Sequence, residues 1–412
     1  MSTSLRRDGP EVGGLVRLIC LLFLAGVAMR LTLLAVPPVI PLIHEELRLS
    51  ETQIGLLVGL PLAMFAVAAV PGSLLIARIG PSLAAVCGMA VATVAGAARG
   101  AAGDVWTLYA AATAAGTGIA VMQPGMPMLV REWMPARIAA GTIAYSSGMV
   151  VGATLPPVLT LGFVLPLAAG SWRVDLLLWA VPPALMTVVF FLLSPKRRDH
   201  ELNMEMTPAT IGALWWPDWE NPLVWLLGFS FGANSGPFFV ANAFLGDYLA
   251  DRGQAHLLGA ALGALNGAQL GGLVLLIAMA GRLQRRAWPF MLFGPAMLAA
   301  FLGFIFLPTP LVIIICSALI GVSTSVTMTA VLALPPLLAE PADVSRTAAG
   351  MLTIAYTCAI VIPTICGALW DLTGKSWTTF VLPCICCVGL TVVGALAARH
   401  PSAAEKLAAR EA

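Results

Sequence analysis

The chain has 412 residues, of which 59% are hydrophobic and 10% charged, and its formal net charge is +2 at pH 7. Soluble domains carry about 25% charged residues, so this composition excludes a water-soluble globular protein. The small net charge argues against a nucleic-acid partner. A membrane-spanning helix needs about 20 apolar residues, and the chain is long enough for about twelve such helices with short loops.

We therefore expect an all-α integral membrane protein whose apolar runs each form one span. The predicted spans are 16–43, 54–77, 82–102, 105–130, 138–167, 172–194, 221–246, 256–280, 287–307, 310–337, 347–371 and 377–399. The longest stretch outside them lies between the sixth and seventh spans.

The lysines and arginines predict an orientation. With the N-terminus inside the cell, sixteen of them fall on the cytoplasmic side and five on the outer side, where Arg48, Arg99, Arg173, Arg252 and Lys375 lie. This bias agrees with the positive-inside rule. It favours an even number of spans with both termini in the cytoplasm.

An internal repeat divides the chain into two halves. The sequence ARIAAGTIAYSSG around Arg137 is similar to SRTAAGMLTIAYT around Arg346, which follows 209 residues later. Each segment begins a span after a short cytoplasmic loop. Two similar six-span halves are a recognised transporter plan. We predict a tail at 1–14, bundles at 15–195 and 221–400, an inter-bundle loop at 196–220 and a tail at 401–412.

Residues 29–80, MRLTLLAVPPVIPLIHEELRLSETQIGLLVGLPLAMFAVAAVPGSLLIARIG, resemble the major facilitator superfamily. Within it they are similar to the cyanate permease and 2-nitroimidazole transporter family. The shared features are an arginine in the first span, the prolines after it, the LRLS segment, and GLL followed by LPL in the second span. The resemblance implies the major facilitator fold, a multi-pass protein of the bacterial inner membrane and a small-molecule substrate of the cyanate class.

The chain departs from the superfamily pattern in the loop after the second span. Aligned on Gly80, the usual aspartate is Ala77, while the arginine after it is kept as Arg78. The equivalent loop in the second half keeps Arg282 but has Gly281 at the aspartate position. These changes put the usual cytoplasmic ion pair in doubt. We interpret the loop arginines as gate or topology residues: Arg78, Arg131, Arg137 and Arg282.

Arg30 is the most specific candidate for the site, because it lies inside the first span. A charge near the bilayer centre costs roughly 3 kcal/mol on insertion scales, and the chain has no Asp or Glu near the middle of any predicted span. A guanidinium binds a planar anion through a fork of donors. The substrate itself would then be the counterion. The alternative is a structural arginine that bonds backbone carbonyls near Pro37 and Pro38.

Uncharged polar side chains recur inside other spans, among them Gln123, Tyr145, Asn234, Asn242, Asn266, Gln269, Thr324 and Tyr356. Any one of them is as readily a hydrogen bond between helices as a ligand contact. Together with Arg30 we select as substrate-binding candidates Asn234, Gln269, Gln123, Tyr356, Tyr145 and Phe238. Packing is the commoner role for an aromatic residue such as Phe238.

The sequence thus predicts a secondary transporter that moves a small anionic or polar planar solute by alternating access around Arg30. The alternative is an efflux carrier for drugs or other apolar solutes, with Arg30 structural. No catalytic, metal or cofactor motif is present, so we do not expect an enzyme. A coupled ion or proton, and a monomeric state, are compatible with this prediction.

Overall fold

A computed structural model describes residues 12–195, 217–278, 286–340 and 343–399. This part of the chain is helical throughout, in agreement with the predicted fold class. The first half contains α1 (Val12–Leu34), η1 (Pro37–Val39), α2 (Ile40–Leu47), α3 (Glu51–Val67), α4 (Ala69–Ile79), α5 (Pro81–Gly100), α6 (Val105–Trp133), η2 (Pro135–Arg137), α7 (Ile138–Leu159), the π-helix η3 (Thr160–Val164), α8 (Leu165–Leu167) and α9 (Trp172–Leu193).

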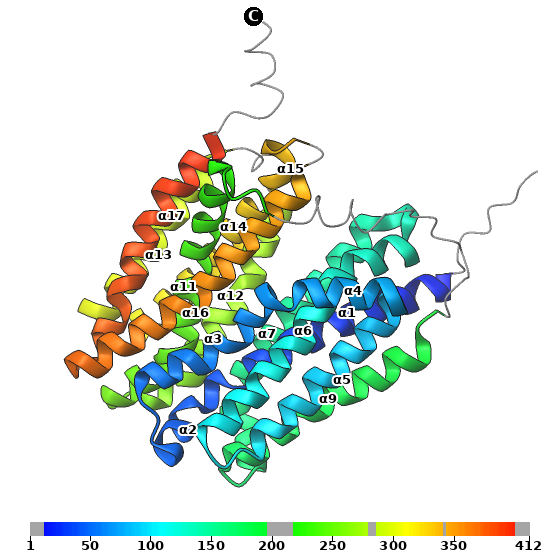
Figure 1. Cartoon of the computed structure of the whole chain (residues 1–412). Coiled ribbons are helices and arrows are strands. Elements are labelled where there is room, and N and C mark those ends of the chain that lie inside the picture. The colour runs from blue at the N-terminus through cyan, green and yellow to red at the C-terminus, as the bar shows by residue number, and fades with distance from the viewer. Residues whose placement is uncertain (1–11, 196–216, 279–285, 341–342, 400–412) are drawn as a thin grey trace, which may run out of the picture.

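The second half contains α11 (Pro222–Asp251), η4 (Ala255–Leu257), α12 (Leu258–Ala278), α13 (Trp288–Phe306), α14 (Pro310–Leu332), α15 (Pro335–Leu338), α16 (Val344–Thr373), η5 (Ser376–Phe380) and α17 (Val381–Arg399). The two halves form separate groups of helices in Figure 1, with α1–α9 running from blue to green and α11–α17 from green to red. Most of the predicted inter-bundle loop lies outside the described residues.

In the described ranges, eleven helices are long and apolar enough to cross a membrane. The second predicted span, 54–77, is the one predicted span not among these eleven, and it is divided into α3 and α4 at Ala68. A continuous helix would need the N–H of residue 71 to bond the carbonyl of residue 67. Residue 71 is Pro71, which has no N–H, and this explains a break at that point.

The first predicted span also ends differently from the expectation. Its helix stops at Leu34 and the chain continues through η1 into α2. Pro37 and Pro38 cannot donate to the carbonyls of Leu33 and Leu34, so the helix cannot continue in regular form. Ser50 then begins α3 by accepting a hydrogen bond from the amide of Gln53, whose side chain in turn accepts from the amide of Ser50.

Glycines allow helices to cross closely inside the first bundle. A Cβ on Gly148 would lie 2.1 Å from the carbonyl oxygen of Phe23, and one on Gly152 would lie 2.3 Å from that of Val27. Both glycines are on α7 and both partners are on α1. Small residues at a crossing let two helix backbones approach this closely.

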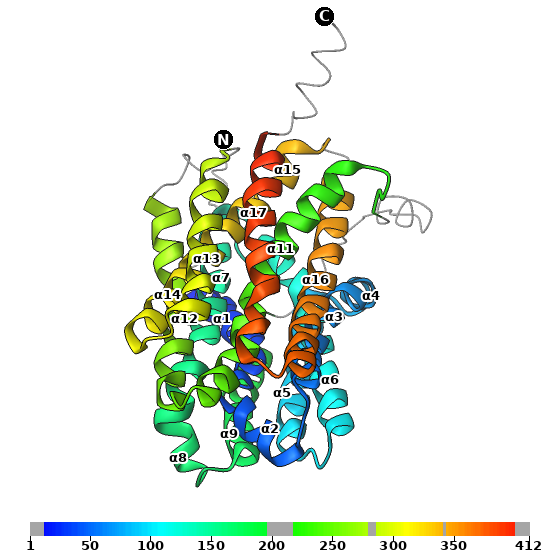
Figure 2. The same cartoon turned by 90° about the vertical axis from the view of Figure 1, so that its left-hand side faces the viewer.

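The two bundles meet along α3 and α16, and along α7 and α12. Figure 2 shows α2 and α8 at one end of the molecule and α15 at the other. We call these the α2 end and the α15 end. The contact of α3 with α16 is tightest near the α2 end, where a Cβ on Gly367 would lie 2.2 Å from the carbonyl oxygen of Glu51.

Candidate functional site

Arg30 lies on α1, a little more than one turn before the helix ends at Leu34. Its side chain is partly buried. Its guanidinium interacts electrostatically with the hydroxyl of Tyr356, which belongs to α16 in the other bundle. The predicted cation is therefore located at the interface between the bundles rather than inside one of them.

Tyr356 connects Arg30 with a second predicted residue. The Gln123 side chain on α6 donates from Nε2 to the Tyr356 hydroxyl over 2.9 Å. The ring of Phe65, on α3, packs edge-on against that of Tyr356, with 5.0 Å between centroids. Arg30, Gln123 and Tyr356 are all partly buried. We call these three residues the central cluster. It combines donors and an aromatic face from both bundles.

Arg99 is the main feature that the sequence analysis missed. We expected it on the outer side of the membrane, but its side chain on α5 is only 2% exposed. One guanidinium nitrogen, Nη2, donates to the carbonyl oxygen of Thr32 at 2.5 Å, while Nε has no hydrogen-bond partner. Thr32 is two residues beyond Arg30 on α1. Two cationic side chains therefore approach the same turn of one helix.

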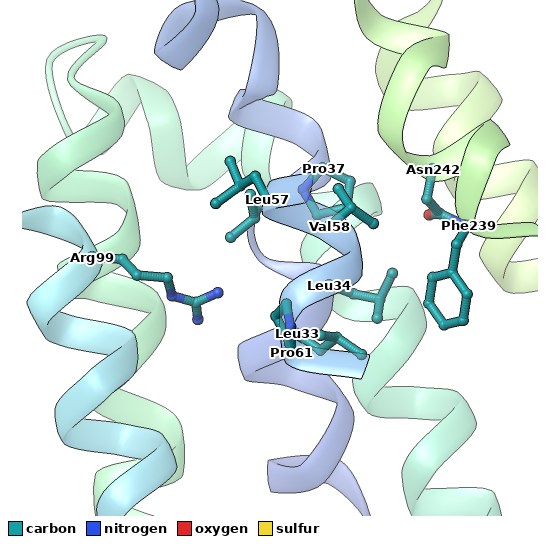
Figure 3. Close-up of a pocket in the computed structure, with 10 residues that line it drawn as sticks. Leu33, Leu34, Pro37, Leu57, Val58, Pro61, Arg99, Phe239 and Asn242 are labelled. Atoms are coloured by element: carbon teal, nitrogen blue, oxygen red, sulfur yellow. The ribbon is translucent and has the colours of Figure 1, made fainter. Parts of the chain in front are cut away.

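Arg99 also borders a small cavity beside the broken end of α1 (Figure 3). The cavity volume is about 20 Å³, enough for about one water molecule. Asn242 and Phe239 on α11 line its opposite side. Its other lining residues are mostly apolar: Leu33, Leu34, Val36, Pro37, Leu57, Val58 and Pro61.

Neither Arg30 nor Arg99 has a carboxylate partner in the described part of the chain. The ion pairs found there involve His44, Arg173 and Arg346 instead. A buried charge without a counterion is costly. Because Arg30 and Arg99 have no neighbouring carboxylate among the described residues, we expect a positive electrostatic potential in the region around them.

Asn234 and Gln269, ranked high from the sequence, have other partners. Asn234 is fully buried; its Oδ1 accepts from the Thr327 hydroxyl at 2.7 Å and its Nδ2 donates to the Thr324 carbonyl at 3.3 Å. These bonds join α11 to α14 within the second bundle. Gln269 is partly buried, and its Nε2 donates to the carbonyl of Asn266 on its own helix at 3.4 Å. No described contact brings either residue to the central cluster.

The remaining predictions are divided between packing and exposed positions. Phe238 is 6% exposed and packs against the ring of Phe239, with 5.3 Å between centroids. Tyr145 is partly buried on α7, and its backbone carbonyl lies where α7 crosses α1. The arginines of the predicted gate set that are described, Arg78, Arg131 and Arg137, are exposed. Arg282 lies outside the described residues.

Polar contacts close the bundle interface at the α2 end. Asp371, on α16, accepts hydrogen bonds from the amides of Glu51 and Thr52 at 2.9 Å each. These are the first two residues of α3, so the carboxylate caps that helix from the other bundle. Close by, His44 Nδ1 lies 3.3 Å from Asp247 Oδ2 on α11. The sequence separates these partners by more than 200 positions, which is why their meeting was not foreseen.

Comparison with known proteins gives the same picture of the fold. The model of the Major Facilitator Superfamily matches residues 19–363. The cyanate transport protein CynX of Escherichia coli K12 is 24% identical over 380 residues, which cover 91% of this chain and 96% of that protein. The 2-nitroimidazole transporter of the same organism is 27% identical over 254 residues, 61% of each chain.

Among solved structures, a bacterial homologue of the human lysosomal transporter Spinster, in an inward-facing and unoccupied conformation, has a TM-score of 0.75. The match covers 94% of this chain and 98% of that one, with 14% sequence identity. At this identity the likeness supports the fold alone.

Proposed function

The chain belongs to the major facilitator superfamily, and on that premise we propose that it carries a small planar anion, or a similarly polar planar solute, across the membrane by alternating access. The central cluster is the observation that carries this proposal. It takes Arg30 and Gln123 from one bundle and Tyr356 from the other. A solute bound there contacts both bundles, which is the arrangement that rocking around a fixed midplane site requires.

The charge of the region favours an anion. The partly buried Arg30 and the buried Arg99 are two guanidinium groups near the same turn of α1, and a planar anion matches the fork of donors that a guanidinium presents. The Tyr356 hydroxyl and the Gln123 amide supply further hydrogen-bond donors. A carboxylate-like or cyanate-like solute would satisfy these groups without a charged partner from the protein.

The similarity to the 2-nitroimidazole transporter supports a second class of solute. A nitroimidazole is planar, and its nitro oxygens can accept from a guanidinium as carboxylate oxygens do. The adjoining rings of Phe65 and Tyr356 offer an aromatic surface for the heterocycle. Under this alternative Arg30 recognises a polar group on a neutral molecule. An efflux carrier for apolar drugs, in which Arg30 is only structural, remains the competing hypothesis.

We assign the α2 end to the outer face and the α15 end to the cytoplasm of a bacterial inner membrane. The support is the excess of lysine and arginine in loops at the α15 end and at both termini. We further propose a monomer. A coupled proton or ion is compatible with this site, but no carboxylate contacts the central cluster among the described residues.

The test is ligand-dependent thermal stability of the purified full-length protein. The ligands are cyanate, acetate, nitrate, 2-nitroimidazole and a lipophilic cation. Ligand at one hundred times its dissociation constant stabilises the folded state by about 2.7 kcal/mol. We expect stabilisation by anions or 2-nitroimidazole in wild type and its loss in Arg30→Ala. Arg17→Ala is the matched control, because Arg17 is exposed on the same helix.

Two results would overturn the proposal. If anions still stabilise the Arg30→Ala protein, Arg30 does not contact the substrate. Stabilisation by the lipophilic cation alone, equal in wild type and Arg30→Ala, supports the apolar efflux carrier instead. Tyr356→Phe adds an independent check, because it removes one hydroxyl while keeping the ring against Phe65. It should weaken ligand binding by about fivefold, the equivalent of one ordinary hydrogen bond.

A further inference from the structure

Three potential metal ligands lie together at the α2 end, apart from the central cluster. They are His44 on α2, Glu51 at the start of α3 and Asp247 near the end of α11. His44 Nδ1 is 3.3 Å from Asp247 Oδ2 and 4.0 Å from Glu51 Oε1. One donor atom from each residue lies within 4.8 Å of the other two.

The two carboxylates are buried and incompletely partnered. Glu51 and Asp247 are each 7% exposed. Glu51 Oε2 is buried and has no hydrogen-bond partner among the described residues, whereas the buried Asp247 Oδ2 lies 3.3 Å from His44 Nδ1 and pairs with it. A buried acceptor without a partner costs about 1–3 kcal/mol, and more if it is charged. The arrangement therefore leaves one buried carboxylate oxygen of Glu51 available to a ligand beside the His44–Asp247 pair.

The groups around Glu51 are mostly acidic. Glu51 interacts electrostatically with Asp247, Asp371 and Asp251, and with the imidazole of His44. Asp371 is occupied by the amides of Glu51 and Thr52, and Asp251 accepts from the Ser376 hydroxyl at 2.6 Å. The groups available to an added ligand are therefore His44, Glu51 and Asp247.

The donor set indicates which dication. Zinc binds imidazole nitrogen as well as carboxylate oxygen, whereas calcium and magnesium prefer sites made of oxygen alone. Two ligands bound at ~2.0–2.1 Å to a tetrahedral zinc ion lie about 3.4 Å apart. The His44–Asp247 separation matches this value, and the His44–Glu51 separation exceeds it by a shift that a side chain can make.

We propose that His44, Glu51 and Asp247 form a binding site for a divalent transition metal of the zinc class. His44 and Glu51 belong to the first bundle and Asp247 to the second, so all three ligands are available only while the α2 end is closed. The bound ion stabilises that conformation by its difference in affinity for the two states. His44 is 31% exposed in its side chain, which gives the ion a route from the aqueous face. This site does not depend on the identity of the transported solute.

The first test is zinc binding to the purified full-length protein, in competition with a chromophoric chelator. We expect one saturable site in wild type. Asp247→Asn and His44→Gln keep the side-chain shape and should weaken binding by at least about tenfold. His256→Gln is the matched control, since His256 is an exposed histidine on the loop after α11, at the same end of the molecule. Cobalt binding checks the ligand type, because coordination by one of the eight cysteines would add a thiolate charge-transfer band.

The second test follows the closure of the α2 end by amide hydrogen exchange. The amides of Glu51 and Thr52 are bonded by Asp371 across the interface. Zinc should slow their exchange in wild type and leave it unchanged in Asp247→Asn. The amides of Trp106 and Thr107 are an internal control, because Asp104 caps them within one bundle. Their exchange should not respond to zinc.

The outcomes are decisive even if a variant is unstable. The wild-type protein must by itself show both saturable zinc binding and slower amide exchange at the start of α3, whatever the stability of the variants. Absence of saturable binding overturns the proposal. The three residues would then bind a proton or only hydrogen-bond to one another. Equal zinc affinity in wild type, Asp247→Asn and His44→Gln overturns it also, as does binding without an effect on exchange.

Discussion

Asp371 and Thr52 belong to different bundles, and together they close one end of the molecule. Asp371 Oδ2 accepts from both the amide and the hydroxyl of Thr52, at 2.9 and 2.5 Å. A carboxylate at a helix N-terminus satisfies amides that have no partner inside the helix. Here the helix and its cap can separate, so the strength of the cap contributes directly to the balance between closed and open states.

Asp371→Asn is expected to weaken this closure. An asparagine keeps one acceptor oxygen but loses the second acceptor and the charge, which should cost the closed state about 0.5–2 kcal/mol. The amides of Glu51 and Thr52 should then exchange about 2- to 30-fold faster. Asp104→Asn, which alters a cap inside the first bundle, should leave these amides unaffected. Unchanged exchange in Asp371→Asn would show that other contacts hold this end closed.

Gly367→Ala tests the same closure by steric means. The added Cβ would lie 2.2 Å from the carbonyl oxygen of Glu51, closer than real Cβ contacts allow, so α3 and α16 must separate there. Because the two helices belong to different bundles, the molecule can relieve the clash by opening rather than unfolding. We expect faster exchange at the start of α3 with little loss of thermal stability. Gly148→Ala, a clash inside one bundle, should instead lower the melting temperature.

Arg99→Met separates a functional from a structural role for the second buried cation. Replacing a buried ion pair with apolar side chains is often neutral, or stabilising by about 1–4 kcal/mol, and Arg99→Met leaves no buried carboxylate without its partner, because none contacts Arg99 among the described residues. We expect an unchanged or higher melting temperature together with an uptake rate, in proteoliposomes, at least about tenfold lower. Normal uptake by a folded Arg99→Met protein would exclude Arg99 from the transport cycle. A large loss of stability would show that the role of Arg99 is structural, through its hydrogen bond to the Thr32 carbonyl.

Asn234→Ala should affect stability and leave ligand affinity unchanged. Its amide is bonded to Thr327 and to the Thr324 carbonyl inside the second bundle, and loss of such buried bonds costs about 1–3 kcal/mol. Ser235→Ala is the matched control, because the Ser235 hydroxyl bonds only to Phe231 in the preceding turn. A clear fall in ligand affinity with unchanged stability would instead indicate that Asn234 contacts the ligand, as the sequence analysis predicted.

The general fold could be predicted because the bilayer imposes it. Each span must be apolar for about 20 residues and must satisfy its own backbone, and both constraints leave a local pattern in the sequence. The exceptions have local causes too. Pro71 explains the division of the second span, and Pro37 with Pro38 explains the early end of the first.

The site was predicted only in part. Arg30 stood out because a charge inside an apolar run is rare, and its electrostatic interaction with Tyr356 follows once the bundles face each other. Arg99 occurs at the end of a span, where an arginine can point to water or fold inward, and the sequence does not distinguish the two. The meeting of His44 with Asp247 depends on the register between the bundles, which no local pattern encodes.

The cap provided by Asp371 also indicates what opening the α2 end would require. Separation of the bundles exposes a carboxylate, two amides of α3 and the neighbouring acidic groups, and each must exchange a protein partner for water. The closed end is thus the less hydrated state, because these groups bond to protein there and to water when the bundles separate. The balance between them is therefore governed by hydration of polar groups, in addition to the apolar contact along α3 and α16.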